Sequence, residues 1–380
     1  MGAAAERADV IVIGAGIAGA SVASELAASS RVLLIEAESQ PGYHTTGRSA
    51  ATFAPSYGPD GVRALTRASH DFLDAPPNGF AATPLLSPRG ILMIAREDQR
   101  EALEALIDAV SHETATRRMG AEEALRLQPL LRRGYAAEGM FDGGGRDIDV
   151  AALHQGYLRH FRANGGRLLT DAPVEALERS AGGWEARTRQ GCFEAPVVVN
   201  AAGAWADQLG RMAGAETIGL TPKRRTALVV AEPEGFTGRD APITIDIDEA
   251  FYLKPDAGRL LISPADETPS APCDAQPEEL DVAICIDRIT TAFDLEIRRI
   301  DNKWAGLRSF VPDKEPVIGY SAVAPGFFWM AGQGGYGVQT APVASRLAAA
   351  LIRRRPVPDP ISDHGFDPAL VAPERLRAGA

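Results

Sequence analysis

Apolar and polar positions along the chain predict short buried strands that alternate with turns and helices. The first apolar run covers residues 9–13, and a glycine-rich turn then leads into a helix-forming stretch at residues 20–28. A second apolar run, residues 31–35, follows that stretch. Two short runs joined by one helical segment predict a strand, a helix and a second, parallel strand.

Three further apolar runs extend this pattern. Residues 166–170, 196–200 and 326–331 each predict a short buried strand. The last of them leads through a second glycine-rich turn, residues 332–340, into a helix predicted over residues 341–352. Thr340 is the predicted N-cap of this helix, and Pro342 lies where the first turn tolerates a missing N–H.

Two segments depart from this alternation of strands and helices. Residues 101–131 are rich in Ala, Leu, Glu and Arg and contain no proline before Pro129, which predicts helix. Between about residues 220 and 304, β-rich runs such as 227–230 and 251–254 alternate with proline-rich turns. That pattern predicts a separate antiparallel sheet.

Composition and charge narrow the possible functions. The 380 residues are enough for two domains, and 45% hydrophobic with 23% charged residues is ordinary globular composition. The formal net charge of -11 argues against nucleic acid and anionic membranes as partners, because both attract basic surfaces. No window of 18 uninterrupted apolar residues is present, so no transmembrane segment is expected. We expect a cytoplasmic protein and leave peripheral membrane association open.

The cysteines and histidines predict no metal site. Cys192, Cys273 and Cys285 are scattered without a CxxC spacing, which fits a reducing compartment without a disulfide framework. No pair of histidines has HxxxH or HExxH spacing, so surface or structural roles are expected. The six histidines are His44, His70, His112, His154, His160 and His364.

The turn after the first apolar run has the glycine spacing of a dinucleotide-binding motif. Gly14 permits a tight turn, Gly16 lets backbone N–H groups approach a pyrophosphate, and Gly19 lets helix and strand pack closely. Glu36 closes the second run. A carboxylate at this position accepts hydrogen bonds from ribose hydroxyls and repels a 2′-phosphate, so NADP is disfavoured. The alternatives for this segment are an ordinary glycine loop or a signal peptide. A signal peptide is disfavoured because glycines interrupt the apolar stretch that it would need. Residues 40–51 predict a loop that lies against the ligand.

Taken together, the motifs resemble the FAD-dependent amine and amino-acid oxidoreductases of the D-amino acid oxidase superfamily, and within it most closely the bacterial D-arginine dehydrogenases. The resemblance covers nearly all of the chain. It rests on Glu36 and on residues 14–19, 41–51, 84–89, 153–158, 200–205, 222–225, 251–256, 304–310 and 333–337.

This resemblance implies an α/β fold with a Rossmann-like FAD-binding domain and an inserted α+β substrate domain that contains a mainly antiparallel sheet. The FAD-binding domain would comprise residues 1–82, 146–220 and 305–380, and the substrate domain residues 83–145 and 221–304. FAD would be held without a covalent bond, although some relatives tether it to a histidine and His44 lies nearby.

The resemblance also implies a set of FAD-binding residues, most of them in the two glycine-rich turns. Amides of residues 335–339, at the start of the last helix, would stabilise negative charge on the reduced flavin. The alternative for this turn is a role in close packing alone. The implied FAD-binding residues are Gly14, Gly16, Ile17, Ala18, Gly19, Glu36, Ala37, Thr46, Gly47, Arg48, Ser49, Ala50, Ala51, Val174, Ala202, Gly203, Trp205, Gly306, Arg308, Gly334, Gly335, Tyr336, Gly337, Val338, Gln339 and Thr340.

The implied activity is oxidative deamination of a D-amino acid. Hydride would pass from Cα to flavin N5, and water would convert the resulting imino acid to a 2-oxo acid and ammonia. Arginine forks suit an α-carboxylate, and phenols are suitable further donors. By resemblance the catalytic residues are Tyr57, Arg225, Tyr252, Arg308 and Gly335. Arg224 would replace Arg225 if the strand register were shifted by one residue.

Two positions depart from the D-arginine dehydrogenase pattern in the substrate side-chain pocket. Ile91 stands where those enzymes have a glutamate that faces the substrate guanidinium, so uncharged or apolar D-amino acids should be preferred over D-Arg. Thr52 stands where they have a histidine, and threonine is a poor general base. Ala54 replaces a hydroxyl residue.

Two other functions remain open on the same scaffold. One is a 2-hydroxy acid or secondary-amine dehydrogenase, because a carboxylate clamp alone does not distinguish an α-hydroxyl from an α-amine. The other is a non-catalytic FAD-binding subunit, which would not need a buried cationic clamp. A quinone, another carrier or O2 would accept the electrons.

Overall fold

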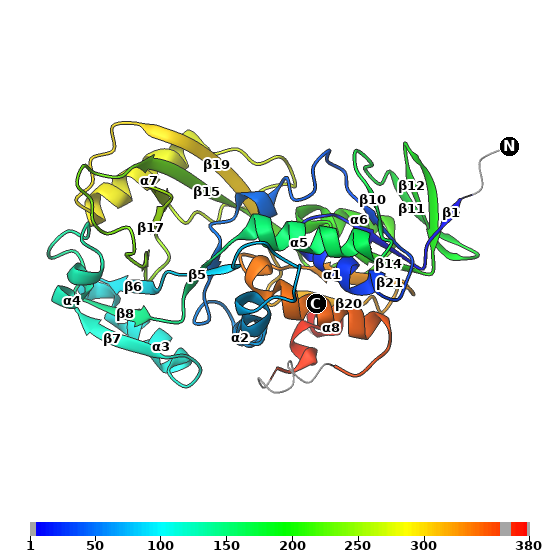
Figure 1. Ribbon diagram of the computed structural model, residues 1–380, viewed down its shortest axis with the longest axis horizontal. Coiled ribbons are helices and arrows are strands. Elements are labelled where there is room, and N and C mark those ends of the chain that lie inside the picture. Colours follow the sequence, from blue (N-terminus) through cyan, green and yellow to red (C-terminus); the bar gives the residue numbers. More distant parts are fainter. Residues whose placement is uncertain (1–4, 358–365, 378–380) are drawn as a thin grey trace.

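The computed structural model describes residues 5–357 and 366–377. Figure 1 shows one half of the molecule built on a six-stranded sheet with helices α1, α5 and α8, and the other half on an eight-stranded sheet with α3, α4 and α7. None of the helices described is long and apolar enough to cross a membrane.

The six-stranded sheet contains the strands predicted at both ends of the chain. Its first five strands are parallel, and the last is antiparallel to its neighbour. Nearly continuous burial of these strands is expected where both faces of a parallel sheet are covered. In spatial order they are β10 (Arg167–Leu169), β3 (Val32–Ile35), β2 (Val10–Ile13), β14 (Val197–Asn200), β21 (Phe327–Ala331) and β20 (Val317–Tyr320).

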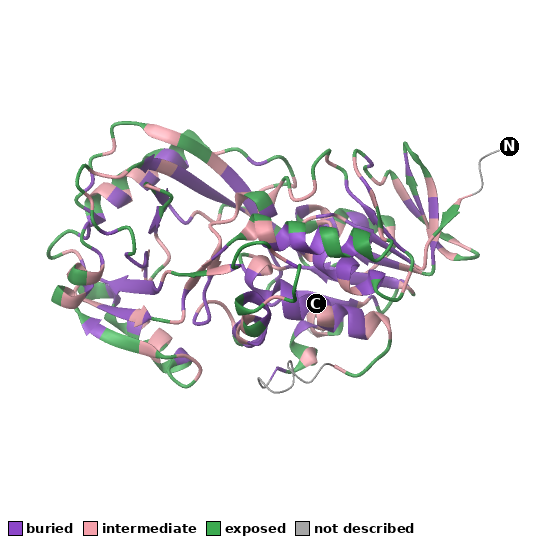
Figure 2. Cartoon of the chain, viewed as in Figure 1, coloured by how far each residue is buried: buried purple, intermediate pink, exposed green. Residues whose placement is uncertain are grey.

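Alternate residues of these strands enter two different cores. Val10 and Val12 pack with helices on one face, whereas Ile11 and Ile13 pack with the side chains on the other face. The first face carries α1 (Ile17–Ala27), α2 (Asp60–Asp74), α5 (Val150–Ala163) and α8 (Gly337–Ile352). Figure 2 shows that α1 and α8 are buried along most of their length.

A four-stranded sheet and helix α6 (Ala206–Met212) cover the other face. Trp184 and Phe193 of this sheet, together with Leu209 of α6, belong to that core. The sheet consists of β1 (Glu6–Arg7), β13 (Gly191–Ala195), β12 (Gly183–Thr188) and β11 (Ala176–Ser180). The α/β class predicted from the sequence is therefore confirmed.

The eight-stranded sheet is mainly antiparallel, as predicted, with one parallel pair formed by β16 and β6. Helix α7 (Glu279–Ala292) packs on β15 and β18. In spatial order the strands are β19 (Ile300–Phe310), β15 (Thr221–Ala231), β18 (Arg259–Ser263), β17 (Tyr252–Asp256), β16 (Ile243–Asp246), β6 (Ile91–Ala95), β8 (Glu138–Asp142) and β7 (Thr116–Gly120).

A small antiparallel sheet lies where the chain passes between the two large sheets. It consists of β4 (Thr52–Phe53), β9 (Arg146–Ile148) and β5 (Leu86–Pro88). Strand β19 crosses the predicted domain boundary at residues 304/305. The two-domain boundaries stay a prediction.

Two details of the predicted elements were wrong. Within residues 101–131, strand β7 separates α3 (Arg100–Val110) from α4 (Ala121–Leu127), because pairing with β8 overrides the helical composition. Helix α8 begins at Gly337 with Tyr336 as its N-cap, so Thr340 is not the cap. The Thr340 hydroxyl instead donates to the Tyr336 carbonyl, and Pro342 lies inside the helix.

Candidate functional site

A chain of three cavities runs from the carboxyl ends of β2 and β3 to the eight-stranded sheet. Their volumes are about 340, 130 and 70 Å³. Gly16 and Thr46 line both the first and the second cavity. Arg225, Tyr252 and Arg308 line both the second and the third. The shared residues make the cavities one continuous site suited to a long ligand.

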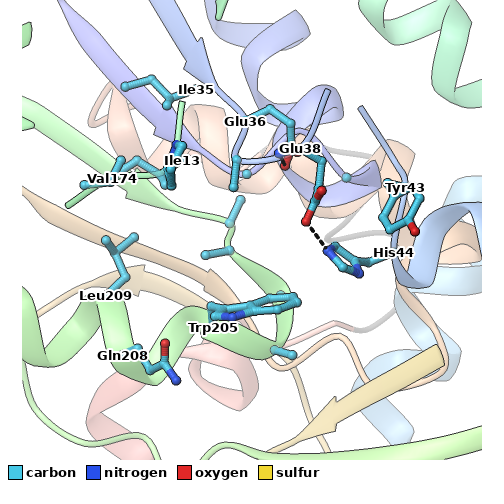
Figure 3. Close-up of a pocket in the computed structure, with 18 of the residues that line it drawn as sticks. Ile13, Ile35, Glu36, Glu38, Tyr43, His44, Val174, Trp205, Gln208 and Leu209 are labelled. Carbon is cyan, nitrogen blue, oxygen red and sulfur yellow. Dashed lines mark hydrogen bonds and ion pairs between the residues drawn. The ribbon is translucent and has the colours of Figure 1, made fainter. Parts of the chain in front are cut away.

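The first cavity combines an apolar wall with a single buried acid. Figure 3 shows Ile13, Ile35 and Val174 along one side of this cavity, with Trp205 beneath it and Glu36 opposite. An apolar pocket with few polar groups is typical of a cofactor site. Its position beyond the carboxyl ends of parallel strands is where α/β sheets bind nucleotides.

The Glu36 carboxylate is held by backbone amides. It accepts hydrogen bonds from the N–H of Ala15 at 2.7 Å and from the N–H of Glu38 at 3.0 Å. Burial raises the pKa of Glu36, and these amide donors act in the opposite direction. The side chain therefore lines the cavity in one fixed position, which suits recognition of hydroxyl groups.

The glycines of the first turn occupy positions that a larger residue would disturb. Gly14 has φ of +100°, and an added Cβ would lie 2.3 Å from the Ala201 carbonyl oxygen. At Gly19 a Cβ would lie 1.7 Å from the carbonyl oxygen of Gly14, so α1 packs directly on the turn. A Cβ at Gly16 would meet only the hydroxyl of Thr46, at 3.2 Å. This leaves the helix terminus open toward the groove.

The loop predicted to lie against a ligand is fixed to strand β19. In the short helix η1 (Thr45–Arg48), the Thr45 hydroxyl donates to the Leu307 carbonyl at 2.7 Å. Arg48 donates to the Ala305 carbonyl at 2.9 Å and forms an ion pair with Asp274. Arg48 lines the second cavity with its charge already compensated.

The second glycine turn brings the start of α8 to the second and third cavities. Thr340 N–H donates to the Tyr336 carbonyl, so residues 337–339 form the first helical turn. N–H groups of a first turn have no partner inside the helix and attract negative charge. A Cβ at Gly335 would lie 3.0 Å from Cζ of Arg308, so this glycine lets the turn approach the guanidinium.

Strand register places two arginines side by side. Arg225 of β15 pairs with Gly306 of β19, and Arg308 of β19 pairs with Lys223 of β15. The two arginines are therefore diagonal neighbours on one face of the sheet. Arg224 lies on the opposite face, where its guanidinium binds Asp281 at 3.0 Å. The register therefore places Arg225, and not Arg224, at the cavities.

Arg225 has a partner that the sequence did not reveal. Its Nη2 lies 3.2 Å from Oε1 of Glu267, and the other oxygen of Glu267 accepts from Lys223 at 2.8 Å. Burial and the charge of Arg308 both lower the pKa of Arg225. Glu267 compensates part of this unfavourable charge.

Two tyrosines and a second acid complete the polar end of the third cavity. Tyr252 lines it from β17, and Tyr57 lines it from the loop after β4. The Tyr57 hydroxyl donates to Oε2 of Glu249 at 2.7 Å. Glu249, which also lines this cavity, belongs to no motif of the sequence, although it lies in an acid-rich segment just before residues 251–256.

The remaining wall of the third cavity is aliphatic. Ile91 and Met93 of β6 pair with Ile243 and Ile245 of β16, and all four side chains line the cavity. Thr52, the other residue predicted for the side-chain pocket, also lines the cavity. This wall of the cavity therefore presents mainly apolar surface.

Four buried polar atoms along the second and third cavities have no hydrogen-bond partner within the described part of the chain. They are Thr52 Oγ1, Arg225 Nε, Ser309 Oγ and Gln333 Nε2. Buried polar groups in native proteins are nearly always satisfied. Their gathering along one groove fits a polar ligand bound there.

The structure brings most of the predicted site residues together. All five residues of the predicted catalytic set line the second or third cavity, as do both side-chain pocket residues. The predicted cofactor residues that line the three cavities are Gly14, Gly16, Ile17, Ala18, Glu36, Ala37, Thr46, Arg48, Ser49, Ala50, Ala51, Val174, Ala202, Gly203, Trp205, Gly306, Arg308, Gly334, Gly335, Gly337, Val338 and Gln339.

Four predicted cofactor residues lie behind the cavity walls. Gly19 packs on Gly14, and the N–H of Gly47 donates to the Gly42 carbonyl at 2.8 Å. Tyr336 and Thr340 are buried at the start of α8. They position the walls and do not line the groove.

Histidine side chains take structural positions in this site. His44 lines the first cavity, and its Nε2 lies 2.9 Å from Oε1 of Glu38. His364 lies outside the described residues. Within residues 5–357 and 366–377, no group of three or more His, Cys, Asp or Glu side chains is arranged to hold a metal ion.

Comparison with known proteins identifies the family. The family model described as FAD dependent oxidoreductase matches residues 9–351. Glycine oxidase from Bacillus licheniformis is 26% identical over 366 residues, which cover 93% of this chain and 95% of that protein. Human mitochondrial dimethylglycine dehydrogenase is 31% identical over 157 residues, or 40% of this chain and 18% of that protein. The chain matches less than a third of the length of the human, mouse and rat dimethylglycine dehydrogenases.

Solved structures show the same fold. L-Proline dehydrogenase from P. horikoshii has a TM-score of 0.84 at 21% identity, with 99% of both chains covered. Glycine oxidase from Geobacillus kaustophilus has a TM-score of 0.82 at 22% identity, with 92% of this chain and 96% of that chain covered.

Proposed function

We propose that this chain, which belongs to the family of FAD-dependent oxidoreductases, oxidises a D-amino acid with an uncharged side chain. The products would be a 2-oxo acid and ammonia, released from the imino acid by water. The observation that carries this proposal is the pair Arg225 and Arg308, placed beside Tyr252 at one end of an otherwise aliphatic cavity.

The three cavities fit FAD in one orientation. Glu36 and the apolar wall would hold the adenosine part, and the amino terminus of α1 would face the pyrophosphate. The second cavity, between η1 and the start of α8, would hold the flavin ring. FAD supplies, when bound, an acceptor for the hydride that leaves the substrate.

The chain's own residues would bind and orient the substrate. Arg225 and Arg308 would make charge-assisted hydrogen bonds to the α-carboxylate, and the Tyr252 hydroxyl would contribute a further donor. Gly335 would leave room for Arg308 beside the turn. The aliphatic wall formed by Ile91 and Met93 would exclude water from the reacting carbon.

Within the family, we infer that this chain is related to the D-arginine dehydrogenases, because it shares the motifs at residues 41–51 and 304–310. Ile91 would give it a preference for a different substrate side chain.

A small amino or imino acid is a second candidate substrate, because the third cavity measures only about 70 Å³. We also propose that the protein is located in the cytoplasm.

Steady-state assays with an artificial electron acceptor test this proposal. D-Leu, D-Met and D-Phe should give 2-oxo acid and ammonia in equal amounts. Their L-enantiomers, glycine, sarcosine and 2-hydroxy acids serve as the comparison set. Turnover confined to 2-hydroxy acids, without ammonia, would assign the site to another reaction.

Gly19→Ala should sharply reduce bound FAD and thermal stability. The new methyl would overlap the Gly14 carbonyl oxygen, a backbone atom, so α1 must move away from the turn. Such overpacking costs about 3 kcal/mol or more when backbone has to shift. Flavin absorbance per protein and the unfolding temperature measure the effect.

Gly120→Ala is the matched control for Gly19→Ala. A Cβ there meets nothing within 4 Å, and Gly120 has an ordinary backbone conformation at the N-cap of α4. It should retain wild-type FAD content. Equal FAD content in the Gly19 and Gly120 variants would contradict the packing role of Gly19.

Glu267→Gln should raise KM for the amino acid with a smaller change in kcat. The change removes the charge that holds Arg225, leaving a buried guanidinium with a weaker partner. Hydrogen bonds to charged groups contribute about 1.5–3 kcal/mol, which corresponds to a KM roughly ten- to a hundredfold higher. Steady-state kinetics measure both constants.

Glu279→Gln serves as the control for Glu267→Gln, because Glu279 forms an exposed ion pair with Lys303. Glu267→Asp should recover part of the loss. A KM unchanged in Glu267→Gln would show that Arg225 does not depend on this partner.

A further inference from the structure

Glu249 places a carboxylate inside the third cavity by means of an uncommon backbone conformation. The residue lies in the hairpin between β16 and β17, where its N–H donates to the Asp246 carbonyl at 2.8 Å. Its φ is +56°, in the left-handed region that disfavours residues other than glycine. Strained backbone of this kind clusters at functional sites, although Ala257 in the next hairpin and other loop residues also adopt it.

The Glu249 carboxylate already has one donor. Burial first, and then the charge of Glu249, raise the pKa of Tyr57, so the phenol stays protonated. It donates to Oε2 of Glu249 at 2.7 Å. A carboxylate accepts several hydrogen bonds, so Glu249 has acceptor capacity left toward the cavity.

The third cavity carries charges of both signs before any substrate binds. The charged side chains that line it are Arg225, Arg308 and Glu249. Glu267 does not line it and is shared between Arg225 and Lys223. Glu249 is therefore the acid that lines the cavity itself.

We propose that Glu249 makes this site select ligands that carry a positive charge beside their carboxylate. An α-amino zwitterion presents its carboxylate to the arginines and its ammonium to Glu249, so each charge of the ligand meets a charge of opposite sign. A 2-hydroxy acid brings the same carboxylate but only a neutral hydroxyl for Glu249, so it lacks the second charge-assisted contact. Glu249 thereby supplies the distinction between amine and hydroxyl that the arginines lack.

This inference rests on the proposed function and deepens it, so its test uses ligands that cannot react. 2-Aminoisobutyrate and 2-hydroxyisobutyrate have the same shape and carry no hydrogen on Cα. Binding of each to the FAD-loaded enzyme at neutral pH is followed by the change in flavin absorbance. The wild type should bind the amino compound at least tenfold more tightly.

Two variants separate charge selection from a purely structural role of Glu249. Glu249→Gln keeps an acceptor for Tyr57 and removes the charge, and it should reduce the preference to less than threefold. Tyr57→Phe removes the hydrogen bond and keeps the charge, and it should retain the preference. FAD content and unfolding temperature check that each variant is folded.

Three results would overturn the inference. They are equal binding of the two ligands by the wild type, an unchanged preference in Glu249→Gln, and binding of neither ligand to the FAD-loaded enzyme. Failure of the proposed function is a separate result, since it shows as absent flavin reduction by amino acids that do carry a Cα hydrogen. The selectivity between the two unreactive ligands is measured whether or not amino acids reduce the flavin.

Discussion

Arg308→Met should lower kcat/KM for the preferred amino acid by about 30- to 3,000-fold, because removing one partner of a buried charged pair costs roughly 2–5 kcal/mol. Arg308 lies at the junction of the second and third cavities, where it can reach the substrate carboxylate beside the flavin. Burial lowers the pKa of Arg308, but the surrounding Tyr57, Tyr252 and Glu249 raise it more, so the guanidinium stays charged. Steady-state kinetics at equal FAD content measure the loss.

Arg308→Lys should recover only part of this activity, since lysine keeps the charge and lacks the planar fork that binds a carboxylate with two parallel bonds. Arg299→Met is the control, because Arg299 is exposed just before β19 and remote from the cavities. Wild-type kcat/KM in a fully FAD-loaded Arg308→Met enzyme would show that the carboxylate binds elsewhere.

D-Leu and D-Met should exceed D-Arg in kcat/KM by about a hundredfold. A guanidinium pressed against Ile91 and Met93 would leave donors unsatisfied at a cost of roughly 1–3 kcal/mol or more for a charged group. An apolar side chain in the same place gains about 25 cal/mol for each Å² buried. Steady-state assays with the three amino acids measure the order.

Ile91→Glu should invert part of this preference by giving the guanidinium a partner. Ile91→Gln is the matched control, since it has nearly the same shape and no charge. A gain for D-Arg in the glutamate variant alone would assign the choice of side chain to charge at position 91. A wild type that already favours D-Arg would contradict the role of Ile91 and point to Glu249 as the group that meets the guanidinium.

Local patterns were sufficient to predict the strands and turns that build the cofactor groove. Gly14, Gly19 and Glu36 occur within one unit of two parallel strands joined by a turn and a helix, so their spacing indicates how they meet. The β-rich stretch after residue 220 likewise predicted the second sheet. Short local patterns specify these strands and turns, whereas the pairing of β15 with β19 and of β16 with β6 joins residues far apart in the chain.

Features that depend on long-range packing were missed or left open. Glu249 and Glu267 lie in connecting segments without a motif, and only the folded sheet brings them to Tyr57 and Arg225. Arg224 and Arg225 were distinguished by the pairing of β15 with β19, because successive residues of a strand face opposite sides.

The same limit applies to the two elements that were predicted wrongly. Strand β7 forms where the composition favours helix, because β8 offers a partner. The first turn of α8 includes Gly337, which propensity alone disfavours in a helix. In this turn Gln339 donates to Thr66 of α2, while Gly337 and Val338 line the groove.

Anaerobic titration of the FAD-loaded protein with D-Leu is the decisive measurement of amino-acid oxidation at this site. We expect the absorbance of oxidised flavin to disappear as the amino acid is added, with one 2-oxo acid and one ammonia formed for each flavin reduced. Flavin that stays oxidised with every amino acid, or that is reduced by 2-hydroxy acids alone, would contradict it.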